Sequence, residues 1–91
     1  MDKKAYQEKQ EALIKEVQAE IDKKKAQAEK AGADAKIKYQ EQIDQLQKKK
    51  DEARNNLDAV KDIGEEKWEE AKKEFEKKSD DVKKKLDDLK S

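Results

Sequence analysis

The sequence predicts an all-α protein, either an antiparallel three-helix bundle or a coiled-coil helical hairpin. Helix-forming residues such as Ala, Glu, Lys, Gln and Leu dominate, and no proline interrupts them. Apolar residues recur at three-, four- and seven-residue steps, which is the spacing of one buried stripe on a helix. Two glycines, Gly32 and Gly64, fall near one third and two thirds of the 91 residues. We therefore expect a single helical domain over residues 1–91 with breaks near these glycines.

Each segment between the breaks predicts one helix, and the apolar stripes of the three helices predict a shared helix-packing seam. The first helix is expected over about residues 3–31, and its seam residues are Tyr6, Leu13, Val17 and Ile21. The second is expected over about residues 34–62, with seam residues Ile37, Ile43, Leu46, Ala53, Leu57 and Val60. The third is expected over about residues 65–90, with seam residues Trp68, Ala71, Phe75, Val82, Leu86 and Leu89. Lys, Glu, Asp and Gln fill most other positions, which predicts solvated outer faces.

The two glycines differ in how clearly they end a helix. Gly64 is the clearer break, because a flexible residue can end one helix while Glu65 and Glu66 suit the first turn of the next. At Gly32 two interpretations stay open. Asp34 could cap a new helix, or the nearby alanines could let one helix run through the glycine at a cost of about 1 kcal/mol. In the second case, a long helix with its last third folded back would dimerise to cover its seam.

Chain reversal at the glycines pairs apolar residues of neighbouring helices, for example Val60 with Trp68. The same alignment leaves polar layers at Lys24, Lys50 and Ser79. A lysine in such a layer can lay its methylene groups along the seam and keep its ammonium in water. It can also set the register or the oligomeric state at the expense of stability.

Composition limits the classes of function. Charged residues make up 53% of the chain and hydrophobic residues 32%, so the core is thin or is shared with another chain. Basic and acidic residues number 24 each and are mixed along the sequence. No segment therefore has the one-signed field that collects phosphates, and Arg54 is the single arginine, which disfavours nucleic-acid binding. With no cysteine and no long apolar run, we expect a cytoplasmic protein without a transmembrane helix.

Catalytic chemistry has little support in this sequence. Histidine, the commonest general base and metal ligand, is absent. Two groups of carboxylates stand out, but lysines interleave them, which predicts solvated faces: Glu65, Glu66, Glu69 and Glu70, and Asp80, Asp81, Asp87 and Asp88. We expect no catalytic residue, no cofactor and no metal site, and hence no enzymatic activity.

Trp68 and Phe75 form the most apolar helical face of the sequence. This face could lie flat on a membrane surface. We favour a place in the hairpin core instead, because Lys78 and Ser79 interrupt the stripe and the segment lacks the excess of cationic charge that draws helices to anionic lipid.

The stretch from Glu20 to Asp62, EIDKKKAQAEKAGADAKIKYQEQIDQLQKKKDEARNNLDAVKD, followed by EEKWEEAKKEFE, resembles a group of small bacterial coiled-coil proteins. Some members, from cyanobacteria and proteobacteria, are described as stress-response proteins. A weaker likeness is to late-embryogenesis-abundant proteins, whose eleven-residue repeats are similar to the series Tyr6, Val17, Ala28, Tyr39. Both resemblances imply a small helical protein linked to stress tolerance, with no catalytic residues.

The leading hypothesis is a non-enzymatic structural or interaction protein, protective under stress, that acts through helix packing. We expect either a compact monomer or a self-associated dimer. A membrane-surface protein of the apolipoprotein type is an alternative. A designed bundle with no biological role is a third hypothesis: the equal helix lengths fit it, whereas Asn55, Asn56 and the lysines in the seam do not.

Overall fold

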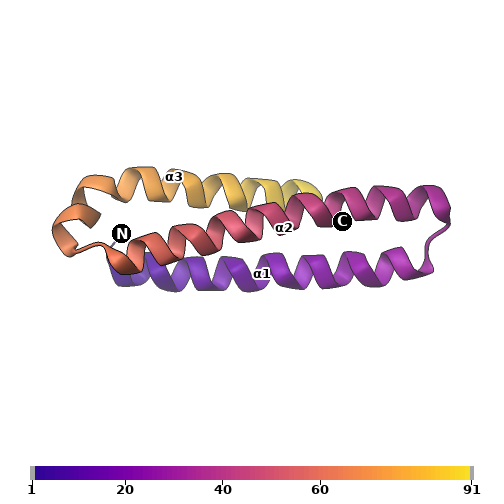
Figure 1. Ribbon diagram of the computed structural model, residues 1–91, viewed down its shortest axis with the longest axis horizontal. Coiled ribbons are helices and arrows are strands. Elements are labelled where there is room, and N and C mark those ends of the chain that lie inside the picture. Colours follow the sequence, from indigo (N-terminus) through magenta and orange to yellow (C-terminus); the bar gives the residue numbers. More distant parts are fainter. Residues whose placement is uncertain (1, 91) are drawn as a thin grey trace.

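The computed structural model describes residues 2–90 and shows an all-α three-helix bundle (Figure 1). The helices are α1 (Lys3–Lys30), α2 (Ala33–Asp62) and α3 (Glu65–Leu89). They run up, down and up along a rod of 52 × 17 × 16 Å, so α1 and α3 are parallel and α2 is antiparallel to both. These bounds lie within one residue of the expected helices.

Both helix breaks use glycine as the N-cap of the following helix. Gly32 has φ −70° and ψ 171°, and Gly64 has φ −78° and ψ 171°, an extended backbone that any residue adopts. The Gly32 carbonyl accepts a hydrogen bond from Lys36 N at 2.8 Å, and the Gly64 carbonyl accepts one from Trp68 N at 2.9 Å. The expected break near Gly32 is therefore confirmed, and the alternative of one helix continuing through Gly32 is wrong; Asp34 lies in the first turn of α2 rather than at its cap.

The start of α1 is fixed at two points. Asp2 is its N-cap, and its Oδ1 accepts a hydrogen bond from Ala5 N at 2.7 Å. Such a cap satisfies a backbone donor that the first helical turn leaves free. Lys3 donates from Nζ to the carbonyl of Ile63, the residue after α2. The beginning of α1 is thereby joined to the α2–α3 turn.

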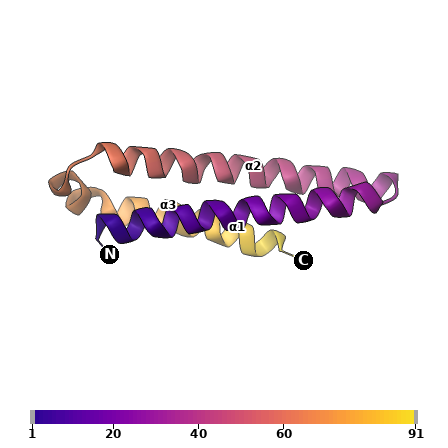
Figure 2. The ribbon, with the colours of Figure 1, turned by 90° about the horizontal axis from the view of Figure 1, so that it is seen from below.

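α3 is the shortest helix and does not reach the α1–α2 turn. Figures 1 and 2 both show its C-terminal end stopping short of that turn, so the last part of the α1–α2 hairpin is only two helices thick. Ile37 lies in this hairpin end and is 62% exposed. The prediction that Ile37 belongs to the packing seam is therefore wrong. It lies six residues before buried Ile43, and six helical positions turn a side chain well away from the buried side.

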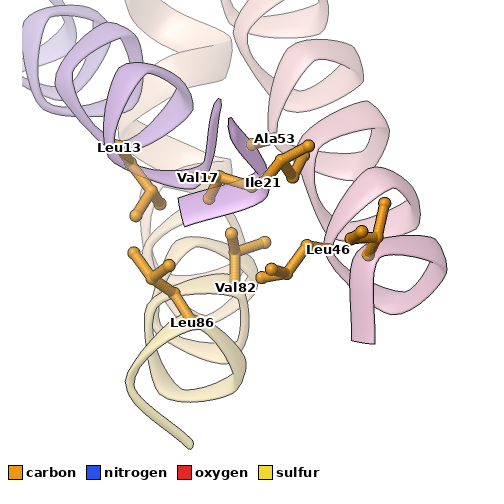
Figure 3. Close-up of a cluster of buried hydrophobic side chains, with 8 residues drawn as sticks. Leu13, Val17, Ile21, Leu46, Ala53, Val82 and Leu86 are labelled. Carbon is orange, nitrogen blue, oxygen red and sulfur yellow. The ribbon is translucent and has the colours of Figure 1, made fainter. Parts of the chain in front are cut away.

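Two apolar clusters form the core. The larger is aliphatic and takes residues from all three helices: Leu13, Val17, Ile21, Ile43, Leu46, Ala53, Val82 and Leu86. Figure 3 shows side chains of this cluster from all three helices turned toward one another. The smaller lies near the α2–α3 turn and consists of Tyr6, Val60 and Trp68, with Ile63 and Phe75 against it. Buried positions recur in steps of three and four, which is the heptad spacing of coiled-coil packing, from Tyr6 to Lys24 in α1, from Ala53 to Val60 in α2 and from Ser79 to Leu86 in α3.

Candidate interaction surface

The structure places most of the expected seam residues inside the bundle. Tyr6, Leu13, Val17, Ile21, Ile43, Leu46, Ala53, Leu57, Val60, Trp68, Val82 and Leu86 are buried. Ala71, Phe75 and Leu89 are half-buried, and Ile37 is exposed as described above. The seam is therefore occupied by contacts within one chain, and a surface for a partner must be sought outside it.

A buried polar layer separates the two apolar clusters, at Ser79, where the sequence predicted one, and at Gln10, which the sequence analysis did not place in it. Gln10 and Ser79 are at most 1% exposed. Ser79 Oγ donates to Gln10 Oε1 at 2.6 Å, and Gln10 Nε2 donates to the Ala53 carbonyl at 3.4 Å. At this level of the bundle a side chain of α1 thus contacts a backbone carbonyl of α2 and a side chain of α3. A buried polar group is tolerated only when it is paired, so the layer favours the alignment in which these three groups coincide.

The aromatic cluster holds α1 against α3. The Tyr6 hydroxyl donates to the Phe75 carbonyl at 2.8 Å. The Tyr6 ring centroid lies 5.1 Å from that of Trp68 and 6.0 Å from that of Phe75, which is the range of favourable aromatic pairs. Burial, reinforced by the nearby carboxylates of Glu76 and Asp80, raises the pKa of Tyr6 to about 12. Trp68 is fully covered, so α3 would have to leave the bundle before this face could meet a lipid surface.

Charged residues enter the bundle where α3 ends. Lys24 is 1% exposed and Glu20 6%, and Glu20 lines a shallow surface pocket together with Lys90, the residue after α3. The Glu20 Oε2 atom finds no hydrogen-bond partner among residues 2–90. Lys50 was expected to form a further polar layer. It is half-buried, and its Nζ donates a hydrogen bond to Gln18 Oε1 at 2.6 Å, which joins α1 to α2. The seam lysines therefore lie inside helix contacts, as the chain reversal suggested.

Each pair of helices leaves a surface groove, and the one between α1 and α2 exposes slightly more apolar surface than the one between α1 and α3. The α1–α2 groove lies on the side without α3, and its volume is about 430 Å³. Half-buried Ile14 and buried Leu57 contribute the apolar surface. Exposed charged residues line the rest of the groove: Glu11, Lys15, Arg54, Asp58 and Lys61. We call these seven residues the open face.

The other two grooves differ in character. The α2–α3 groove is polar, with Asn55, Asn56 and an ion pair between Lys49 and Glu52 at 3.1 Å. The α1–α3 groove is bridged by an ion pair between Lys83 Nζ and Glu16 Oε2 at 3.0 Å, and this hydrogen bond raises the pKa of Lys83. The open face has no such bridge: none of its charged side chains makes a hydrogen bond or ion pair in the part of the chain that the structure describes.

The carboxylate groups singled out in the sequence lie in solvent. All eight are exposed, and Glu69 pairs with Lys72 at 2.9 Å. Among residues 2–90 no three carboxylates come close enough to hold a metal ion. None of the three described helices is both long and apolar enough to cross a membrane.

Comparison with known proteins finds no matching family model, no matching curated protein and no matching solved structure.

Proposed function

We propose that this chain is a structural or interaction protein that self-associates by helix packing through its open face, and that it is not an enzyme. The open groove between α1 and α2 is the observation that supports this proposal. Its apolar floor, half-buried Ile14 and buried Leu57, is still partly accessible to water, and covering that remaining surface with another helix is favourable by about 25 cal/mol for each Å² of apolar area. Arginine, which is frequent at protein interfaces, lines it once, at Arg54.

The buried polar groups support the same proposal. The side chains of Gln10, Ser79 and Tyr6 are used to join helices to one another. In a bundle only 17 × 16 Å in cross-section, the chain can bury a limited share of its surface alone. Association with a second chain would add to the apolar area that is removed from water.

Sedimentation equilibrium of the wild type and of two matched variants tests the proposal. Ile14→Glu places a charge in the groove, whereas Ile37→Glu makes the same change at an exposed site outside it. We expect a concentration-dependent dimer for the wild type and for Ile37→Glu, and a monomer for Ile14→Glu. Circular dichroism checks that all three remain helical. Equal association of the two variants would show that the groove is not the contact.

A further inference from the structure

The charges of the open face occur in an order that a second copy of the same chain can match. We propose that two copies pack face to face about a two-fold axis that crosses the helices at right angles. In this dimer α1 lies antiparallel to α1 of the second copy, and α2 lies antiparallel to α2 of the second copy. The inference rests on the proposed function, since it names the partner and the geometry for the same face.

The charges of α1 are complementary under this rotation. Glu11 and Lys15 both line the groove, and their midpoint is position 13. Reversal about that midpoint places Glu11 against Lys15 of the second copy. Lys4 lies seven residues before Glu11, and Asp22 lies seven residues after Lys15. In a heptad-packed helix Lys4 therefore lies on the same helix face as Glu11, and Asp22 on the same face as Lys15. The same reversal places Lys4 against Asp22 of the second copy.

α2 repeats this arrangement independently. Arg54 and Asp58 line the groove, and their midpoint is position 56. Reversal about position 56 places Arg54 against Asp58 of the second copy. Asp51 lies seven residues before Asp58, and Lys61 lies seven residues after Arg54. These two also meet as opposite charges under the same reversal, so each helix offers two complementary pairs.

One axis can serve both helices. Gln10 reaches the Ala53 carbonyl and Lys50 reaches Gln18. The first contact places position 13 of α1 level with position 50 of α2 and the second places it level with position 55, on average about one helical turn from position 56. A two-fold axis midway between the two levels displaces each charge pair by about that one turn, about 5.4 Å, which the long side chains of lysine and arginine can span.

Ile14 and Leu57 are each one residue from a midpoint and therefore lie near the axis. Each would meet its own copy there. The dimer then has an apolar centre and a charged rim, the usual anatomy of a protein interface, and each residue contacts the same patch on the other chain as in other two-fold dimers.

Charge reversal separates this geometry from others. In a dimer of Glu11→Lys, each introduced lysine faces Lys15 of the other copy, and in a dimer of Lys15→Glu each introduced glutamate faces Glu11. We expect either single variant to self-associate about tenfold more weakly than the wild type, because two attractive pairs become repulsive. An equimolar mixture of the two variants restores opposite charges at both places. The mixture, and the double variant Glu11→Lys/Lys15→Glu, should associate as the wild type does.

Disulfide trapping tests the position of the axis. The chain has no cysteine, so a single introduced thiol reports one contact. We expect Ile14→Cys to form a disulfide-linked dimer under mild oxidation, because this residue faces its own copy. Glu74→Cys, an exposed site on α3 away from the open face, is the matched control and should stay largely unlinked.

The outcomes distinguish the inference from the proposed function. A wild type that is monomeric up to about 1 mM has no useful self-affinity, and this result would overturn both. A wild-type dimer whose affinity is insensitive to Glu11→Lys and Lys15→Glu, or in which Ile14→Cys links no faster than Glu74→Cys, would overturn the two-fold geometry while self-association stands.

Discussion

The buried hydrogen bond between Ser79 and Gln10 gives the most direct test of how this bundle is held together. Ser79→Ala removes the hydroxyl that donates to Gln10 Oε1 at 2.6 Å. Both side chains are at most 1% exposed, so water cannot easily replace the lost donor. A buried acceptor left unpaired costs about 1–3 kcal/mol. In a domain of this size each kcal/mol lowers the melting temperature by about 4–8 °C.

Replacing both partners should remove most of that cost. In Gln10→Leu/Ser79→Ala the layer becomes apolar, and leucine has nearly the volume of glutamine. The Ala53 carbonyl keeps its backbone partner within α2, so no polar atom of the layer is left unpaired. Replacing both groups of a buried hydrogen bond by apolar groups of similar shape can be neutral or stabilising.

Guanidinium chloride unfolding followed by circular dichroism measures this comparison. All variants must be compared at one low protein concentration, because any association of folded chains adds to the apparent stability. We expect the double variant to be more stable than Ser79→Ala. If Ser79→Ala unfolds at the wild-type midpoint, or if the double variant is less stable than the single one, the assignment of the layer is wrong.

Three further results follow from the structure. Gly32→Ser should raise the stability by about 0.5–1 kcal/mol, because the residue has negative φ, nothing lies within 4 Å of an added Cβ, and serine is a better N-cap; a lower melting temperature would contradict this. Folding raises the pKa of Tyr6 from 10.0 to about 12. The contribution of Tyr6 to stability is therefore fully present below pH 10 and is lost as the pH rises from 10 to 12. Between pH 9 and 12 the free energy of unfolding should fall more steeply for the wild type than for Tyr6→Phe. Ile37→Ser should change the free energy of unfolding by less than about 0.5 kcal/mol, whereas Leu46→Ala should cost about 2–5 kcal/mol, and similar values for the two would be inconsistent with their exposures of 62% and 0%.

The sequence was sufficient to predict the helices and most of the core, because helix period and glycine spacing are local properties of the chain. Buried polar residues were harder to find. Gln10 lies four residues after Tyr6 and three before Leu13, so its position alone marks it as buried. Its polarity led to its assignment to the surface. Glu20 was missed for the same reason, seven residues after Leu13.

The open face is formed by two helices together, so the pattern of either helix alone does not predict it. Ile14 lies beside the stripe of α1, and Arg54 was notable only as the single arginine. The α1–α2 packing brings the two into one groove. The exposure of Ile37 likewise depends on where α3 ends relative to α1 and α2, which is a tertiary property.

The short length of α3 also makes the rod uneven in its dynamics. Near the α2–α3 turn each helix is held by two neighbours, whereas at the α1–α2 turn each has only one (Figure 2). Segments with few buried apolar contacts open with a smaller free energy than the rest of a protein. Backbone amides of residues 26–39 should therefore exchange their hydrogens with solvent faster than those around Val17, Leu46 and Val82. The molecule then frays from the α1–α2 turn inward, one helical turn after another.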